Sequence, residues 1–260
     1  MPMITADDGC QIYVTVEGRD DAPALMLSNS LGTNLGMWDD QAGEFAKHFR
    51  LVRYDRRGHG RSGVPQGPYS MERFGRDVIN VLDALDIEKT SFCGLSMGGM
   101  VGQWLGANAP GRIEKLILSN TNYYYAEKVF WNDRIKAVQE NGLVPLVEPN
   151  MQRWFTEGFR NSAPATMDRM KAMFLATKVP GYVGCCEAIA AMDFRPTNPS
   201  ITAPTLVIVG SQDAATPPAA GEAIAQQIKG AKVASLDAAH ISNVEQPKKY
   251  TETALNFLAG

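Results

Sequence analysis

The sequence has few cysteines, few histidines and no long apolar run, and each shortage argues against a class of protein. Only four of the 260 residues are cysteine, no C-x-x-C occurs, and Cys185 and Cys186 are adjacent, so we expect reduced thiols and no disulfide framework. The three histidines show no metal-ligand spacing, which disfavours a zinc hydrolase. No apolar stretch is long enough to span a membrane, and the first residues lack the features of an export signal. These absences predict a cytoplasmic protein without a metal.

Neither sign of charge dominates the sequence. The net charge is −3, the isoelectric point is about 5.7, and no block of basic residues occurs, so neither a nucleic acid nor a membrane surface is an expected partner. A chain of 260 residues that is 45% hydrophobic can bury one sizeable core, which favours one domain with an insertion over two domains. The sequence leaves open whether the protein is a homo-oligomer.

The most informative motif that is present is G-L-S-M-G at residues 94–98, a G-x-S-x-G pattern. A short β-prone stretch, 90–93, precedes it, and residues 98–108, which can form a helix, follow it. Strand, sharp turn and helix is the setting in which this motif exposes a nucleophilic serine. A serine hydroxyl needs a base to remove its proton and a group to receive the developing oxyanion. We therefore predict Ser96 as a nucleophile, the alternative being a glycine-rich turn with an incidental serine.

Short apolar stretches alternate with helical ones along most of the chain. We predict strands at 4–5, 11–16, 24–28, 51–54, 90–93, 113–119, 205–209 and 231–236, and helices at 38–49, 70–85, 98–108, 218–228 and 248–258. Asp8-Gly9 between the first two strands predicts a hairpin. The alternation predicts an α/β fold with a mostly parallel, doubly wound sheet.

Residues 121–198 interrupt this alternation. A simple crossover needs about a dozen residues, whereas roughly eighty separate the strands at 113–119 and 205–209. The segment is rich in Trp, Tyr, Phe and Met, and it is too apolar for a disordered linker. We predict a helical lid at 121–198, inserted before the last two strands and lying over the carboxyl ends of the strands. The hydrolase-like core would then consist of residues 1–120 and 199–260.

Two residues near the C-terminus are candidates for a triad with Ser96. His240 follows the last predicted strand and Asp213 follows the strand before it, so both should lie on the same edge of the sheet as Ser96. Ser, Asp, His is the order of a triad in α/β-hydrolases. His240 would take the Ser96 proton, and Asp213 would hold the imidazole in the useful tautomer.

Other residues compete for these roles. His59 is an alternative base, although a structural role in its Gly- and Arg-rich loop is favoured. His48, on a predicted helix beside Lys47, is expected at the surface. Asp193, at the exit of the predicted lid, is an alternative to Asp213 as the acid.

The oxyanion hole is expected to combine two backbone N–H groups, that of Met97 and that of Leu31 in the loop 28–34. Because both donors belong to the backbone, the side chains in this loop do not decide whether the hole exists. Hydrogen bonding within the loop would account for Asn29 and Ser30.

With these residues in place, the chain resembles the α/β-hydrolase superfamily over essentially its whole length. Within that superfamily it is similar to the 3-oxoadipate enol-lactonase group. The residues that carry the closer similarity are 29–33 with 37–39, 54–62, 94–105 and 237–247. The elbow and the D-x-R-G-x-G-x-S loop mark only the superfamily, whereas the N-S-L-G-T loop with Met37-Trp38 is more specific.

The resemblance implies a cofactor-free serine hydrolase that opens 3-oxoadipate enol-lactone to 3-oxoadipate in the β-ketoadipate pathway of aromatic catabolism. Because this lactone bears a carboxylate, the pocket should offer hydrogen-bond donors or a cation. The candidate lid cations are Arg134, Arg153, Arg160 and Lys178. The predicted substrate-binding residues are Ser30, Trp38, Trp131 and Trp154.

Three other functions remain open at this point. One is a general carboxylesterase or cofactor-free perhydrolase with the same triad. Another is a hydrolase of C–C bonds that acts on ring-cleavage products. The third is not an enzyme but a ligand-binding receptor with a silent hydrolase fold. A dehalogenase is excluded because its nucleophile would be an aspartate where Ser96 stands.

Overall fold

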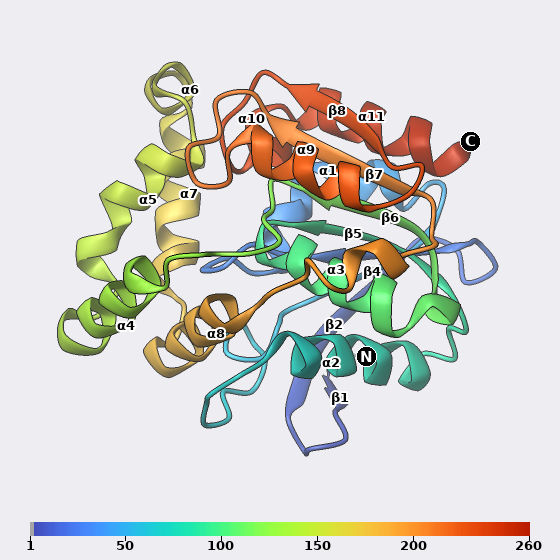
Figure 1. The fold of residues 1–260 in the computed structure, drawn as a ribbon, viewed down its shortest axis with the longest axis horizontal. Coiled ribbons are helices and arrows are strands. Elements are labelled where there is room, and N and C mark those ends of the chain that lie inside the picture. Colours follow the sequence, from blue (N-terminus) through green and yellow to red (C-terminus); the bar gives the residue numbers. More distant parts are fainter. Residues whose placement is uncertain (1–2) are drawn as a thin grey trace.

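Eight strands form one sheet, in the order β1-β2-β4-β3-β5-β6-β7-β8, in the computed structural model, which describes residues 3–260 (Figure 1). The strands are β1 (Met3–Thr5), β2 (Gln11–Glu17), β3 (Ala24–Ser28), β4 (Arg50–Tyr54), β5 (Thr90–Leu95), β6 (Ile113–Ser119), β7 (Thr205–Gly210) and β8 (Lys232–Leu236). Strands β3 to β8 are parallel, and β1 and β2 are antiparallel to their neighbours. Residues 1 and 2 of the predicted core range lie outside the described residues.

The first two strands form the predicted hairpin. Ile4 lies opposite Ile12, and Gly9 in the turn has a φ of +86°, which a residue without Cβ adopts at little cost. The hairpin then pairs with β4 through β2, so it extends the sheet at the antiparallel edge. The mostly parallel, doubly wound α/β sheet expected from the sequence is confirmed.

The core helices are α1 (Asp39–Phe45), α2 (Met71–Ala84), α3 (Met97–Asn108), α9 (Pro218–Gln227), α10 (Ser242–Glu245) and α11 (Pro247–Ala259), with short 3₁₀ turns at η1 (Leu35–Trp38), η2 (Pro110–Arg112) and η4 (Asn198–Ser200). Helices α1 and α11 contact each other on one face of the sheet, and α2, α3 and α9 cover the other (Figure 1). Because both faces are covered, central strands such as β5 and β7 are buried along their whole length and can be apolar throughout.

The helix predicted at 38–49 is shorter than expected. The chain first makes the 3₁₀ turn η1, capped by the Asn34 side chain, and α1 ends at Phe45. After Phe45 the backbone passes so close to Gly18 that a Cβ there would lie 2.2 Å from the Phe49 carbonyl oxygen. The chain then enters β4 at Arg50. Helical periodicity alone does not reveal where α1 ends.

Five α-helices are inserted between β6 and β7. They are α4 (Val129–Asn141), α5 (Val147–Trp154), α6 (Glu157–Ser162), α7 (Pro164–Leu175) and α8 (Val179–Ala191), with the 3₁₀ turn η3 (Val144–Leu146). The two ends of the insertion meet where Tyr124 pairs with Asp193. Figure 1 shows the inserted helices at the left, on the side toward which the parallel strands point. They fall within the predicted range 121–198, and the division of the chain at those residues stays a prediction.

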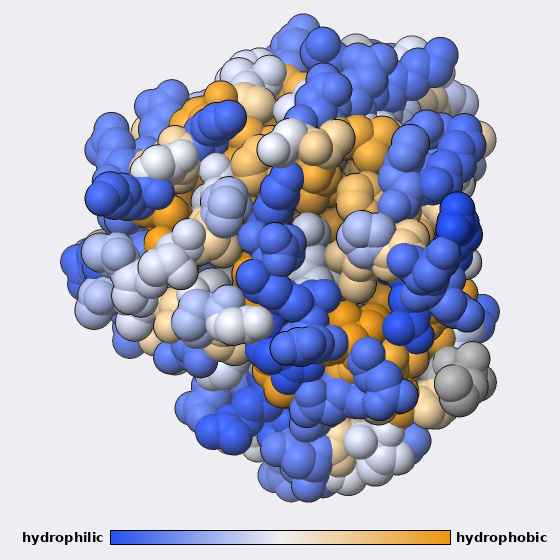
Figure 2. All heavy atoms as spheres, turned by 90° about the vertical axis from the view of Figure 1, so that its right-hand side faces the viewer, coloured by the Kyte–Doolittle hydropathy of each residue, from blue (hydrophilic) through white to orange (hydrophobic). Residues whose placement is uncertain are grey.

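The face opposite the inserted helices is mainly hydrophilic (Figure 2). Figure 2 shows the face turned away from the inserted helices, where hydrophilic side chains cover most of the area and apolar side chains lie between them. Within residues 3–260, no helix combines the length and the apolar character needed to cross a membrane.

Candidate active site

Ser96 occupies the turn between β5 and α3. Its φ of 57° and ψ of −117° lie outside the conformations that residues with a side chain prefer, so the turn is strained. The neighbouring segment holds it in place, because the Ser96 N–H donates to the Ser119 carbonyl at 2.8 Å and the Thr121 hydroxyl donates to the Ser96 carbonyl at 2.7 Å. The sheet therefore fixes the position of the Ser96 side chain.

Two glycines of the motif are required by close backbone contacts. A Cβ on Gly94 would lie 2.1 Å from the Gly98 carbonyl oxygen, and a Cβ on Gly98 would lie 2.1 Å from the Ser28 carbonyl oxygen. Neither position can hold a side chain unless the backbone shifts. The motif thus brings the elbow against the loop that follows β3.

A chain of hydrogen bonds joins Ser96, His240 and Asp213. The His240 Nε2 atom lies 2.9 Å from the Ser96 Oγ atom, and the His240 Nδ1 atom lies 2.9 Å from Asp213 Oδ2. All three side chains are buried. With the Nδ1–H donating to the carboxylate, Nε2 is free to accept the serine proton, which is the arrangement that general-base activation of a serine requires.

The Asp213 carboxylate is held by five donors. Its Oδ1 atom accepts the N–H groups of Ala215 and Thr216, and its Oδ2 atom accepts from the Thr216 hydroxyl, the Asn120 amide and His240. Burial would by itself raise the pKa of Asp213, but His240 and these hydrogen bonds lower the pKa to about 2. The acid therefore stays ionised beside the imidazole.

The competing residues lie elsewhere. The His59 Nε2 atom accepts the Gly32 N–H at 2.9 Å, and burial lowers the pKa of His59 to about 3, with the nearby charge of Arg56 adding to the effect. His48 is exposed in the turn after α1, and exposed Asp193 pairs with Arg195 at 2.7 Å. None of the three approaches Ser96 as His240 does.

The two predicted oxyanion donors flank the elbow. Met97 is the first residue of α3, where the helix offers its N–H no carbonyl four residues earlier. Leu31 lines the same pocket as Ser96 and His240, and within the described part of the chain its N–H has no acceptor. The geometry is compatible with an oxyanion hole at these amides, which stays a prediction.

Ser96 and His240 open into a pocket between the sheet edge and the inserted helices. Three of the four predicted substrate-binding residues, Ser30, Trp131 and Trp154, lie in its wall. The other wall residues are Leu31, Met100, Tyr125, Phe130, Arg134, Asn150, Arg153, Tyr182, Ile189, Ala215 and Thr216. The inserted helices α4, α5 and α8 thus supply most of the wall that faces the serine.

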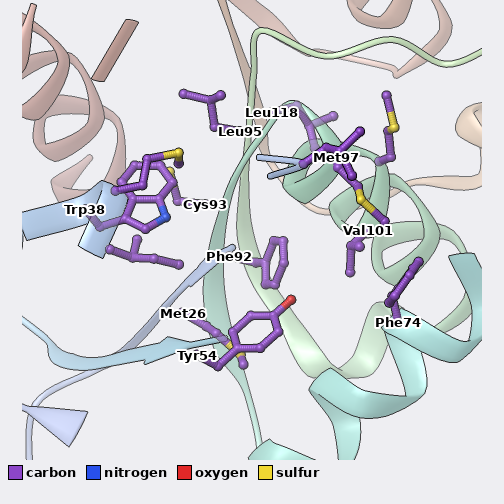
Figure 3. Close-up of a cluster of buried hydrophobic side chains, with 14 of the residues drawn as sticks. Met26, Trp38, Tyr54, Phe74, Phe92, Cys93, Leu95, Met97, Val101 and Leu118 are labelled. Atoms are coloured by element: carbon purple, nitrogen blue, oxygen red, sulfur yellow. The ribbon is translucent and has the colours of Figure 1, made fainter. Parts of the chain in front are cut away.

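The expectation that Trp38 lines the pocket is wrong. Trp38 is fully buried, and its ring lies 5.8 Å from the ring of Tyr250 on α11. Figure 3 shows it beside Cys93, across β5 from Met97 and Val101. Because the 3₁₀ turn η1 ends at Trp38, the side chain points between the sheet and α11. A Met-Trp pair in a loop sequence does not reveal this orientation.

The four candidate cations separate into two groups. Arg134 and Arg153 lie in the pocket wall, whereas Lys178 is exposed and Arg160 donates to the Phe155 carbonyl at 2.6 Å. Within residues 3–260, the wall contains these two arginines and no Asp or Glu. The pocket therefore favours an anion.

Several donors in this wall are not used within the protein. Arg134 donates to the Tyr182 hydroxyl and to Asn150 Oδ1, each at 2.7 Å, but buried Asn150 Nδ2 and Trp131 Nε1 have no partner in the described chain. Burial lowers the pKa of Arg153, and the nearby charge of Arg134 lowers it further. Buried donors and cations without partners are costly unless a ligand satisfies them.

Sequence reasoning missed three polar residues around the triad. Asn120, directly after β6, donates to Asp213 and to the Ala239 carbonyl, and its φ of 45° is left-handed. Thr216 also contacts Asp213, and Glu245 accepts the Ala239 N–H. The position of Asn120 at the carboxyl end of a strand next to β5 was the available signal. For Thr216 and Glu245 the sequence offered no such signal.

The possible metal ligands and the cysteines lie scattered through the described part of the chain. Across residues 3–260, no group of three or more His, Cys, Asp or Glu side chains is arranged to hold a metal ion. All four cysteines are free and buried. The predicted lack of a metal and of a cofactor stays a prediction.

The sequence and the fold match known proteins. A family model described as the alpha/beta hydrolase fold matches residues 23–247, and the chain therefore belongs to the α/β-hydrolase family. Within that family it is 42% identical to 3-oxoadipate enol-lactonase 2 of Acinetobacter baylyi, over 95% of this chain and 92% of the relative. It is 38% identical to 3-oxoadipate enol-lactonase 1 of the same organism, over 98% and 96%. The crystal structure of the enol-lactonase from Burkholderia xenovorans LB400 superposes with a TM-score of 0.97 at 40% identity over the whole of both chains.

Proposed function

We propose that this protein hydrolyses 3-oxoadipate enol-lactone to 3-oxoadipate through an acyl-enzyme on Ser96. The observation that carries the proposal is the Ser96–His240–Asp213 chain of hydrogen bonds at the floor of a pocket whose wall holds two arginines and no carboxylate. The similarity to two 3-oxoadipate enol-lactonases over nearly the whole chain supports the choice of substrate.

The reaction would begin with attack on the lactone carbonyl. His240 Nε2 takes the Ser96 proton as Oγ bonds to the carbonyl carbon, and the Leu31 and Met97 N–H groups receive the oxyanion. The bond from the carbonyl carbon to the ring oxygen then breaks, the departing oxygen takes the proton from His240, and the enol that results tautomerises to the ketone. Water, activated by His240, hydrolyses the Ser96 ester and releases 3-oxoadipate.

The inserted helices α4 to α8 would act as the lid that recognises the substrate. The substrate carboxylate would lie against Arg153, the pocket arginine that is not already bound to Tyr182 and Asn150. The unpartnered Trp131 and Asn150 donors lie in the same wall. A fixed anionic end would orient the lactone carbonyl over Ser96, and orientation is a large part of the barrier for a strained ring with a good leaving group.

The proposal is tested by comparing kcat/KM for 3-oxoadipate enol-lactone with kcat/KM for short p-nitrophenyl esters, with a chelator present throughout. We expect a clear preference for the lactone and no effect of the chelator. A preference for the neutral esters would make the protein a general carboxylesterase, and loss of activity on chelation would make it a metal enzyme.

A second measurement separates the enzyme from a silent receptor. A fluorophosphonate should label Ser96 in the wild-type protein and should not label Ser96→Ala. The absence of labelling in the wild type would favour a ligand-binding receptor. A cytoplasmic location also remains part of the proposal, and it rests on four cysteines that are all free.

A further inference from the structure

A buried carboxylate links the loop of the catalytic histidine to the inserted helices. Glu245, in α10, is 7% exposed, and its Oε2 atom accepts the N–H of Ala239, the residue before His240, at 2.9 Å. Its Oε1 atom accepts the N–H of Thr156 at 3.2 Å and also the Thr156 hydroxyl. Thr156 is the N-cap of α6. A single side chain therefore binds both the core and the insertion.

A second hydrogen bond joins the same two segments. The N–H of Ile241, the residue after His240, donates to the carbonyl of Trp154 at 3.0 Å. Trp154 ends α5, and its side chain lies in the pocket wall. The residues on both sides of His240 are thus held by groups that also contact the insertion or belong to it.

The chemistry of the link requires a carboxylate. All the groups that face Glu245 in these contacts are donors, namely the N–H groups of Ala239 and Thr156 and the Thr156 hydroxyl. Two carboxylate oxygens can accept all three, whereas the NH₂ group of a glutamine would face a donor. Hydrogen bonds to a charged group are among the stronger ones in a protein.

We propose that Glu245 is a positioning residue that holds His240 against Ser96 and makes the placement of this base depend on the inserted helices. Glu245 contacts neither Ser96 nor the pocket, so it acts through the backbone of Ala239. This role of Glu245 rests on the proposed function only for the identity of the substrate, because any ester opened by Ser96 needs the same base.

The test compares Glu245→Gln, Thr156→Val and Thr156→Ser with the wild-type protein, on 3-oxoadipate enol-lactone and on p-nitrophenyl acetate. We expect Glu245→Gln to lower kcat about 10- to 100-fold on both substrates, with KM changed by less than about 3-fold, because a charged hydrogen-bond acceptor is lost from behind the base. Thr156→Val should lower kcat by about 3- to 10-fold, and Thr156→Ser, which keeps the hydroxyl, should restore it.

Two controls distinguish positioning from general loss of stability. Thr251→Val removes a threonine hydroxyl that donates to the Pro247 carbonyl within α11, away from His240, and should leave kcat unchanged. The double variant Glu245→Gln with Thr156→Val should be no worse than Glu245→Gln alone, because the two residues form one link. If Glu245→Gln does not fold, the matched Thr156 pair still gives the result.

The proposal would be overturned if Glu245→Gln kept the wild-type kcat or changed only KM. It would also be overturned if Thr156→Val and Thr156→Ser had equal kcat. Failure of the proposed function would look different. In that case the wild-type protein would not open the enol-lactone, while its hydrolysis of p-nitrophenyl acetate would still depend on Glu245.

Discussion

The sheet edge and the inserted helices differ in whether their buried polar side chains have hydrogen-bond partners within the described protein. At the sheet edge the three side chains Ser96, His240 and Asp213 are bound to one another, and Asp213 accepts five hydrogen bonds in all. In the wall formed by the inserted helices, buried Trp131 Nε1 and Asn150 Nδ2 have no partner within residues 3–260. The reacting side chains are thus held by the protein, whereas these two wall donors are not.

We expect the side chains at the sheet edge to serve the reaction and those of the inserted helices to serve substrate recognition. Groups that stabilise a transition state work best when they are fixed in advance, since no reorganisation is then needed during the reaction. Groups that recognise a substrate gain most when the substrate satisfies donors that were otherwise unpaired. Changes at the triad should therefore affect kcat on every substrate, whereas changes in the pocket wall formed by the inserted helices should have effects that depend on the charge of the substrate.

The largest effect is expected from Ser96→Ala. This change removes the nucleophile and leaves the backbone, and loss of such a serine costs on the order of 10⁶-fold in kcat in a related triad. Turnover of the lactone and of neutral esters should be measured together with circular dichroism to verify the fold. Near-wild-type turnover on either substrate would contradict a serine mechanism.

The next effect is expected from Asp213→Asn, which should lower kcat on the order of 10⁴-fold because the imidazole is held in the wrong tautomer. The matched control is Asp193→Asn, since Asp193 is exposed and, among the described residues, its carboxylate binds only Arg195. Its kcat should stay close to that of the wild type. A larger loss in the control than in Asp213→Asn would reverse the assignment of the acid.

In the inserted helices, Arg153→Met should raise KM for the enol-lactone by about 10- to 100-fold and leave the hydrolysis of p-nitrophenyl acetate unchanged, because only the lactone carries a carboxylate. Arg160→Met is the control, since Arg160 binds backbone carbonyls outside the pocket. Equal effects of the Arg153 change on both substrates would mean that this arginine shapes the pocket and does not bind the anion.

The smallest effect concerns the boundary between the two regions. His59 lies there, with Nε2 accepting the Gly32 N–H and Nδ1 3.8 Å from Cys185 on α8. Folding lowers the pKa of His59 from 6.5 to about 3, so its contribution to stability is complete above pH 6.5 and is lost as the pH falls toward 3. Between pH 7 and pH 5 the free energy of unfolding should drop by about 2 kcal/mol from this residue.

Urea unfolding at pH 7 and pH 5 measures this drop. His59→Gln keeps an acceptor for the Gly32 N–H and does not titrate, so its free energy of unfolding should depend less on pH than that of the wild type. The same slope in both proteins would show that folding does not lower the pKa of His59.

The reach of sequence reasoning also differs between the two regions. In the core, the G-x-S-x-G turn and the carboxyl ends of the last two strands led directly to Ser96, Asp213 and His240, and the structure brings these three side chains together. The carboxyl ends of parallel strands meet at one edge of the sheet, so a residue that directly follows a strand is expected at that edge. Strand order gave no place for Trp38, which was expected in the pocket on the family resemblance alone, and its side chain lies in the core.

In the insertion, the sequence indicated helices and aromatic side chains but not which of them face the serine. Arg134, Arg153, Arg160 and Lys178 were equivalent candidates, and only the packing of α4, α5 and α8 put the first two in the pocket.

The sequence by itself determined the fold class and predicted Ser96, Asp213 and His240, which the structure brings together, because local motifs and strand order carry that information. The tertiary structure alone decided which side chains form the pocket and how Glu245 joins the insertion to His240, because contacts between helices far apart in the chain depend on packing that no local pattern encodes.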